Sequence, residues 1–218
     1  MNYVQLKQAI KGYTENTFPQ TAGDFTTEEQ LAVFVGNAEE RIYNSVQLPA
    51  LRKNVLGTMT AGNKYLTVPT DWLSNFSLAV IDPITQDYVY LMDKDVNFIR
   101  EAYPTPLAMG TPRYYSIFDN NTYILGPTPD QSYDVELHYF HYPASIVVAG
   151  VSWLGDNFES ALLYGSLLEA IAFMKEEPDV LANYQKRYDD AMVILKQLAE
   201  GKNRSDAYRN GQIRTAIR

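Results

Sequence analysis

The side chains that most often bind metals or act in catalysis are scarce in this sequence. Cysteine is absent, and the only two histidines, His138 and His141, stand three residues apart in the segment LHYFHYP. If this segment is a β-strand, residues three apart point to opposite faces of the sheet, and the two rings cannot easily share an ion. We therefore predict two ordinary sheet histidines, no metal and no cofactor.

Paired carboxylates are the remaining candidates for acid–base catalysis. The acidic pairs that lie on or beside predicted helices are Glu159 and Glu169, Glu176 and Glu177, and Asp189 and Asp190. Lysine and arginine residues stand nearby, so solvated helix faces and helix caps explain these pairs. No phosphate-binding loop and no GxGxxG, GxSxG or HExxH motif is present in the sequence. We predict that the protein is not an enzyme, and we keep a carboxylate-pair enzyme as a third alternative.

Charge is distributed unevenly along the chain. The 218 residues carry a net charge of -8, which opposes general nucleic-acid binding, because affinity for phosphate needs clustered lysine and arginine. Residues 202–218 contain five basic residues and one acidic residue, so this segment carries +4 and residues 1–201 carry -12. The sequence therefore predicts an acidic body with a basic C-terminal segment, and no sequence-specific nucleic-acid binding.

Neither a secretion signal nor a membrane span is evident in the sequence. The first residues, MNYVQLKQAIKGYTE, lack a basic segment followed by an apolar one, and no run approaches the roughly 18 apolar residues of a membrane-spanning helix. The absence of cysteine fits a reducing compartment. We therefore expect a soluble, intracellular product with no membrane partner.

Two helices are predicted in the first 50 residues. Residues 3–14 carry apolar side chains near helical spacing. Thr26 precedes Glu29 by three residues, which is the capping-box pattern, and an apolar stripe follows that stops near Pro49. These features predict a short helix and a longer amphipathic one.

A helical hairpin is predicted near the other end of the chain. Asp156 can cap its first helix, and Pro178 suits the first turn of its second helix. Gly201 and Lys202 then end the second helix as helices usually end. The apolar residues expected to share one face of the first helix are Phe158, Leu162, Gly165, Leu168, Ile171 and Ala172.

The residues between these helices have the pattern of a β domain. Short runs with alternating or β-rich composition are separated by turn residues: VLGTMT, KYLTVP, FSLAVID, DYVYLMD, RYYSIF, NTYILG and SYDVELHYF. One exception, DKDVNFIREAYP, has the pattern of a short helix. We predict an α+β fold in which residues 1–50 and 150–201 form an antiparallel helical bundle. Residues 51–149 form an inserted antiparallel β-sheet or sandwich block, and residues 202–218 an extended C-terminal arm.

Seventeen tyrosines are many for a chain of this length, and ten of them lie in the β block. An aromatic ring with a polar tip suits a half-buried sheet face and also suits an interface between subunits. Both interpretations stay open. The residues that we name as a candidate subunit or tail interface are Tyr114, Tyr115 and Tyr139.

The C-terminal segment NRSDAYRNGQIRTAIR has only scattered apolar residues. One interpretation is a terminus without fixed structure. The other is an arm that folds onto a partner, with apolar anchors between arginines that meet an acidic surface. The residues predicted to make these contacts are Arg204, Tyr208, Arg209, Ile213, Arg214, Ile217 and Arg218.

Three stretches have an order and spacing that can be compared with a known family. The first, KYLTVPTDWLS at 64–74, is a strand that leads to a proline, an acidic residue and an aromatic residue. The second, GTPRYYSIFDNNTYILGPTPDQSYDVELHYFHYP at 110–143, contains two strands, a proline-rich turn and a last strand. The third is the helical hairpin, with its Leu-Leu-Tyr-Gly start and short acidic turn. Taken together, these stretches resemble the head-to-tail adaptor proteins of short-tailed bacteriophages, which include tail-tubular and head-completion proteins.

The resemblance implies a structural protein of the virion. Such a protein forms a ring of about twelve copies between the portal and the tail nozzle, retains the packaged genome and attaches the tail. It is assembled in the host cytoplasm and stands at the head–tail junction, where the genome passes through the ring. In these adaptors a C-terminal segment reaches the portal protein, so residues 203–218 are expected to be the portal-binding arm. The alternative is a tail-associated binding module that recognises carbohydrate or protein through the tyrosine-rich β block.

Overall fold

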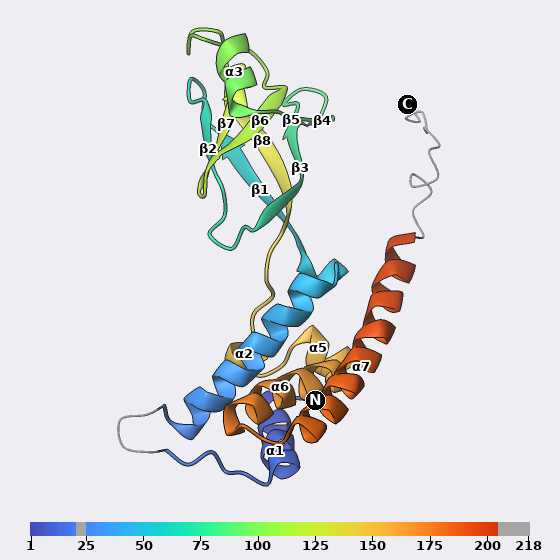
Figure 1. Cartoon of the computed structure of the whole chain (residues 1–218). Coiled ribbons are helices and arrows are strands. Elements are labelled where there is room, and N and C mark those ends of the chain that lie inside the picture. Colours follow the sequence, from blue (N-terminus) through green and yellow to red (C-terminus); the bar gives the residue numbers. More distant parts are fainter. Residues whose placement is uncertain (21–24, 205–218) are drawn as a thin grey trace. The chain divides into compact units, whose positions relative to one another are not determined.

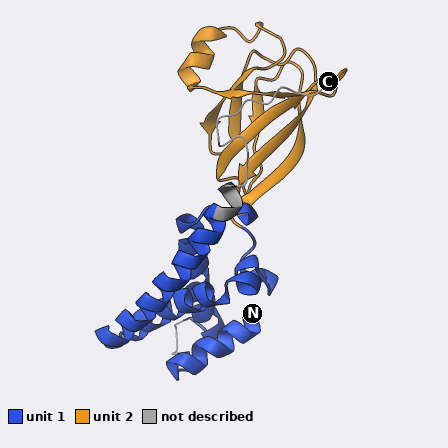
Figure 2. Ribbon diagram, turned by 90° about the vertical axis from the view of Figure 1, so that its right-hand side faces the viewer, with its two compact units in different colours: residues 1–50, 143–218 blue, residues 51–142 orange. Residues whose placement is uncertain are grey.

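In a computed structural model, the described part of the chain, residues 1–20 and 25–204, forms two compact units (Figure 1, Figure 2). Residues 201–204 are described by their backbone alone. Unit 1 contains Met1–Ala50 and the chain from Pro143 onward, and unit 2 is Leu51–Tyr142. Helices dominate unit 1, and the strands lie in unit 2, so the predicted α+β class is confirmed.

The helices of unit 1 begin where local hydrogen bonds favour a helix. They are α1 (Tyr3–Thr14), α2 (Thr27–Ser45), α4 (Ile146–Ala149), α5 (Trp153–Asn157), α6 (Glu159–Met174) and α7 (Pro178–Arg204). The predicted capping box of Thr26 and Glu29 is confirmed at the start of α2, and Asn2 and Gln5 form a second one at the start of α1. Pro178 stands in the first turn of α7, as predicted.

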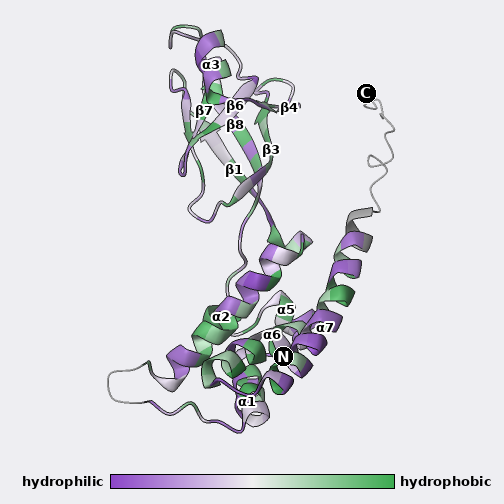
Figure 3. Ribbon diagram, in the orientation of Figure 1, coloured by the Kyte–Doolittle hydropathy of each residue, from purple (hydrophilic) through white to green (hydrophobic). Residues whose placement is uncertain are grey.

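Helix α6 lies at the centre of unit 1. It packs against α1, α2, α5 and α7, and eight of its 16 residues are buried. At Gly165 α6 lies close to two neighbouring helices, since a Cβ atom there would stand 3.2 Å from the Ala38 Cβ of α2 and 3.2 Å from the Tyr188 ring of α7. Burial therefore extends beyond the single apolar face that the sequence predicts, and Figure 3 shows more hydrophilic residues on α7 than on α6.

The start of α6 differs from the prediction. Phe158 holds the N-cap position and makes no side-chain cap, whereas Asp156, the predicted cap, lies inside the preceding helix α5. Ser152 explains the difference, because its hydroxyl oxygen accepts a hydrogen bond from the backbone N–H of Gly155 (3.1 Å) and starts a helix earlier in the chain.

Residues 143–149, which we expected in the β block, group with unit 1. Glu39 of α2 is 3% exposed, and its carboxylate accepts a hydrogen bond from the backbone N–H of Ile146 (3.0 Å) at the start of α4. Burial raises the pKa of the Glu39 carboxyl, although hydrogen bonds from Ser145 and Ile146 partly oppose the shift. A side chain of α2 therefore holds the segment that returns from unit 2.

Unit 2, which is described throughout, contains eight strands in two four-stranded sheets. Sheet A has the order β1-β8-β3-β4 and sheet B the order β2-β7-β6-β5. The strands are β1 (Arg52–Met59), β2 (Tyr65–Thr67), β3 (Ser74–Ile81), β4 (Tyr88–Tyr90), β5 (Met92–Asp93), β6 (Tyr114–Asp119), β7 (Thr122–Gly126) and β8 (Tyr133–Phe140). Because Arg52 pairs with Phe140, the two ends of unit 2 lie side by side.

Both sheets contribute side chains to one shared core. Strand β8 shows the pattern most clearly, since its residues alternate between buried and partly or fully exposed along the strand. The buried members of the core are Met59, Val68, Leu78, Val80, Leu91, Tyr115, Tyr123, Leu125, Tyr133, Val135, Leu137 and Tyr139. These residues come from segments as far apart in the sequence as β1 and β8.

One strand pair departs from the predicted antiparallel arrangement. Strand β5 pairs with β6 in parallel, because the segment between them crosses over and includes the predicted short helix, α3 (Val96–Ala102). Helix α3 packs on β6 and β7. Gly126 of β7 permits this approach, since a Cβ atom there would stand 2.8 Å from the Tyr103 ring and 3.0 Å from Ile99. Within the described residues, every helix is too short or too polar to span a membrane.

Candidate interaction surfaces

The predicted C-terminal arm lies mostly outside the described residues. Helix α7 continues through Gly201 to Arg204, so the predicted end at Gly201 and Lys202 is wrong. The backbone of Arg204 forms the last helical residue. The other residues assigned to the arm are outside the described part of the chain: Tyr208, Arg209, Ile213, Arg214, Ile217 and Arg218. Their contact with the portal stays a prediction.

Two of the three tyrosines named as a candidate interface are buried in the core of unit 2. Tyr115 is 4% exposed and packs edge-to-face on Tyr123, with ring centroids 5.6 Å apart. Tyr139 is 1% exposed, and its hydroxyl donates a hydrogen bond to Asp71 (2.8 Å). Their rings support the sheets from inside, so these two residues do not present a surface to a partner.

The third tyrosine, Tyr114, is half-buried beneath α3. Its ring packs against Phe98 at a centroid distance of 5.4 Å and lies near Tyr103 at 6.5 Å. Tyr114 therefore fixes α3 on sheet B, and its side chain is only partly exposed.

Asp71 is the centre of the charged cluster nearest to the histidines. Its carboxylate lies 2.7 Å from the Lys53 ammonium and 3.8 Å from Nδ1 of His141, and it accepts the Tyr139 hydrogen bond. Hydrogen bonds from Lys53 and then from Tyr139 lower the pKa of Asp71. The cluster joins the loop before β3 to β1 and β8, which is a structural role.

The two histidines do not share a site. The ring of His138 packs on Phe76 at a centroid distance of 4.7 Å, whereas His141 lies beside Asp71. Among residues 1–20 and 25–204, no group of three or more His, Cys, Asp or Glu side chains could hold a metal ion.

Structural contacts hold three of the six paired carboxylates that we considered, Glu159, Glu169 and Asp189. Glu169 forms a salt bridge with Arg41 of α2, and Glu159 lies 3.7 Å from the N-terminal ammonium group. Asp189 accepts a hydrogen bond from Gln185 on the same helix face (2.8 Å). These partners belong to helix packing rather than to an acid–base pair.

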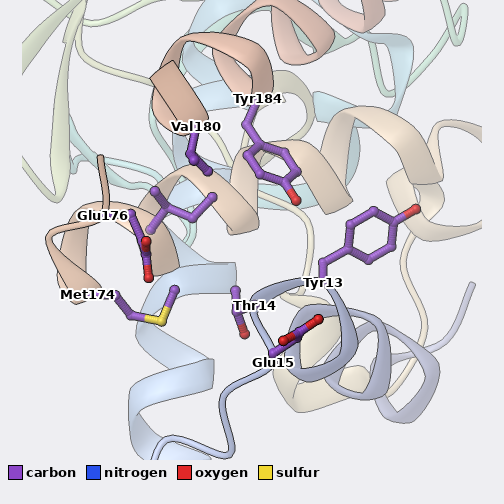
Figure 4. A pocket seen from close by; sticks show the side chains of 8 residues that line it. Tyr13, Thr14, Glu15, Met174, Glu176, Val180 and Tyr184 are labelled. Atoms are coloured by element: carbon purple, nitrogen blue, oxygen red, sulfur yellow. The ribbon is translucent and has the colours of Figure 1, made fainter. Parts of the chain in front are cut away.

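Unit 1 contains a small pocket where α1, α6 and α7 meet (Figure 4). Tyr13 and Glu15 line it from the end of α1, Met174 and Glu176 from the end of α6 and the turn after it, and Tyr184 from α7. Its volume of about 160 Å³ is below the roughly 300 Å³ at which ligand pockets usually begin. A pocket of this size has room for a few water molecules.

The outer side of sheet A is an exposed aromatic surface that our sequence reasoning missed. Strand pairing aligns Leu56, Glu136, Ala79 and Tyr90 in one row across the four strands. The next row consists of Thr58, Asp134, Ile81 and Tyr88. We call this surface face A and define it as Arg52, Asn54, Leu56, Thr58, Phe76, Ala79, Ile81, Tyr88, Tyr90, Asp134, Glu136, His138 and Phe140.

Face A leaves large apolar side chains in contact with solvent. Leu56 is 67% exposed, Tyr90 66%, Phe76 51% and Tyr88 50%. Several large apolar side chains exposed on one side of a sheet are typical of an interaction surface. The sequence contained a signal for this surface. In DYVYLMD, bulky apolar residues occupy both the odd and the even positions, which indicates a strand with both faces covered.

The outer side of sheet B carries cations on aromatic rings. The Lys64 ammonium lies 5.3 Å from the centre of the Tyr65 ring, Arg100 lies 5.3 Å from Phe118, and Lys94 lies 5.6 Å from Phe98. The Tyr65 and Phe118 rings are themselves 5.4 Å apart. We call this surface face B and define it as Lys64, Tyr65, Met92, Lys94, Phe98, Arg100 and Phe118.

Comparison with known proteins gives a family match for the chain. No curated protein matches the chain. A family model described as SU10 adaptor protein matches residues 1–215, which is nearly the whole sequence and includes both units. The chain is therefore a bacteriophage adaptor protein, a structural component of the virion, and it belongs to the SU10 adaptor protein family.

Proposed function

We propose that this adaptor protein forms a ring between the portal and the tail nozzle of a short-tailed bacteriophage, where it retains the genome and attaches the tail. The family match over residues 1–215 carries the proposal. We further propose that the role is structural and not enzymatic, at the head–tail junction, with about twelve copies in the ring.

The charge distribution supports a separate role for the C-terminal segment. Residues 202–218 carry +4 on a chain whose remaining residues carry -12, so the segment is suited to an acidic surface of another molecule. We propose that Arg204, Tyr208, Arg209, Ile213, Arg214, Ile217 and Arg218 bind the portal protein. An acidic body also suits a channel for DNA, because negative walls do not retain a passing genome.

Native mass spectrometry tests the proposal directly. The full chain is measured alone and after mixing with the portal protein that the same phage genome encodes. We expect a complex with a fixed number of adaptor copies for each portal ring. Two unchanged spectra would refute the proposal.

A truncation tests the arm. Deletion of residues 205–218 should abolish portal binding and leave the melting temperature of the protein unchanged, because the cores that the structure describes in both units are built from residues before this segment. A full-length variant in which residues 205–218 are scrambled in order keeps the charge of this segment and is the matched control. It should bind the portal only as far as that binding depends on charge. Full portal binding by the truncated protein would remove the arm from the mechanism.

The exposed tyrosines of face A favour the second candidate function, a tail-associated module that binds carbohydrate. Tyr88 and Tyr90 present their rings to solvent, and aromatic rings of this kind can stack on sugars. A glycan array with the full chain separates the two functions, since the adaptor should bind no glycan.

A further inference from the structure

Face A and face B of unit 2 are complementary in charge. On face A, Asp134 and Glu136 stand among exposed apolar residues, and neither forms a salt bridge within the described chain. On face B, the cations Lys64, Lys94 and Arg100 also lack a salt bridge among the described residues. Face A also carries one cation, Arg52, over the Phe76 and Phe140 rings, so two carboxylates leave it with an excess of negative charge, whereas the cations of face B give that face an excess of positive charge.

The chemical surroundings of Glu136 make face A an acidic surface. Its carboxylate accepts a hydrogen bond from the side chain of Asn54, and it forms no salt bridge among the described residues. The negative charge of Glu136 is the main cause of a raised pKa at the neighbouring Tyr88 hydroxyl. The one arginine at this side of the sheet, Arg52, lies over the Phe76 ring at 4.8 Å, near the Phe140 end of the face.

Two carboxylates near face B, those of Asp95 and Asp119, already have local partners. Asp95 caps α3 by accepting a hydrogen bond from the backbone N–H of Asn97 (2.7 Å), and Asp119 accepts one from the N–H of Asn121 (2.8 Å) in its own turn. The cations of face B lie over exposed aromatic rings. A second surface that carries apolar side chains and carboxylates would shield both the rings and the cations from water.

We propose that face A of one copy packs on face B of a second copy of this chain. Contact between two A faces would oppose carboxylates to carboxylates, and contact between two B faces would oppose cations to cations, so like charges disfavour both symmetric pairings. A contact between two different faces is head-to-tail, and its repetition closes a ring when the rotation between copies permits. The inference deepens the proposed ring, and it identifies the surfaces through which neighbouring copies meet.

Cysteine cross-linking tests the contact, because the chain contains no cysteine of its own. Tyr90→Cys marks face A and Phe98→Cys marks face B, at positions that are 66% and 41% exposed. With a short bismaleimide, the full-length double variant should give a ladder of covalent oligomers. A mixture of the two single variants should give dimers and nothing larger, and each single variant alone should stay monomeric. The control for random collision combines Phe98→Cys with Asp190→Cys, at an exposed position of α7 in unit 1.

A charge exchange provides a second, independent measurement. Glu136→Lys or Arg100→Glu alone should lower the association constant between copies at least about tenfold, because each reversal opposes like charges across the contact. A mixture of the two variants should recover association, since the altered face A of one then meets the altered face B of the other. Unchanged circular dichroism spectra establish that each variant is folded.

Both measurements are made on the concentrated free protein and on its complex with the portal. Absence of the ladder in both samples, or dimers from Tyr90→Cys alone, would overturn the contact. Portal complexes of fixed stoichiometry without a ladder would leave the proposed function standing and refute this inference alone. A ladder in the free protein, without any portal binding, would support the contact and refute the portal role.

Discussion

Replacement of Asn75 by alanine should destabilise unit 2 through the loss of a buried acceptor. The Asn75 side-chain oxygen accepts hydrogen bonds from the indole N–H of Trp72 (2.7 Å) and from the hydroxyl of Tyr123. Tyr123 is fully buried, with 0% of its surface exposed, and burial raises the pKa of its hydroxyl. The substitution would therefore leave two donors without their acceptor between the two sheets.

The expected cost can be worked out from the exposure of each donor. A buried donor that loses its partner costs about 1–3 kcal/mol, and we assign about 2 kcal/mol to the Tyr123 hydroxyl and about 1 kcal/mol to the partly exposed Trp72 indole. The amide nitrogen of Asn75 is itself buried and has no partner among the described residues, so its removal offsets about 1 kcal/mol. The net expectation is a loss of about 2 kcal/mol in the free energy of unfolding.

The two tryptophans allow this loss to be measured in unit 2 by itself. The chain has two, Trp72 in unit 2 and Trp153 in unit 1, so the fluorescence of a Trp153→Phe background reports on unit 2. At an m value of about 2 kcal/mol per molar urea, the midpoint should fall by about 1 M. The matched control is Asn120→Ala at an exposed turn position, which should change the free energy of unfolding by less than about 0.5 kcal/mol.

A double-mutant cycle then identifies the hydrogen bond as the cause. In a Tyr123→Phe background one of the two donors is already gone, so Asn75→Ala should cost about 1–2 kcal/mol less than in the unaltered protein. A cost below about 0.5 kcal/mol for Asn75→Ala in the first measurement, or an equal cost in both backgrounds, would refute the reasoning.

Three further predictions concern unit 1, and Trp153 fluorescence in a Trp72→Phe background measures each of them. Glu39→Gln should remove a pH dependence of the free energy of unfolding. The pKa of the buried Glu39 carboxyl is raised, so the folded state binds this proton more tightly than the unfolded state does. The contribution of Glu39 to the free energy of unfolding therefore falls as the pH rises above the ordinary pKa of a glutamate carboxyl. The gain in stability of the glutamine variant over the unaltered protein should therefore grow between pH 4 and pH 7, and a constant difference would contradict this. Gly165→Leu should lower the free energy of unfolding by about 2 kcal/mol or more, because a Cβ there already meets Ala38 and Tyr188 at 3.2 Å; an unchanged urea midpoint would refute it. Gly36→Ala should raise the free energy of unfolding by about 0.5–1 kcal/mol, since this position of α2 has nothing within 4 Å of a Cβ, and a destabilised variant would show an unrecognised contact.

Local chemistry explains why many elements could be predicted. The capping box of Thr26 and Glu29, the proline at position 178 and the turn residues between strands act within a few residues of themselves, so their effects can be read along the chain. The failures at Asp156 and Gly201 are also local. Ser152 starts a helix before Asp156 can cap one, and Gly201 is tolerated inside α7, where it weakens the helix without ending it.

Pairing between distant segments could not be read in the same way. Strand β8 lies between β1 and β3, and the parallel pair of β5 and β6 depends on a crossover through α3. The sequence shows which residues alternate, but the choice of partner depends on side chains from segments far away in the chain, which pack together only after folding.

For the candidate sites, the tyrosines show which properties could be predicted from the sequence and which required the tertiary structure. Their number and their place in the β block were evident from the sequence, and so was their suitability for either a core or an interface. The tertiary structure assigns Tyr115 and Tyr139 to the core and Tyr88 and Tyr90 to an exposed face. The sequence by itself determined the α+β composition, the capped helices, the acidic body with its basic end and the resemblance to phage adaptors. Only the tertiary structure decided which side of each strand is covered, because burial is set by the sheet or helix that packs against a side chain and not by its neighbours in the chain.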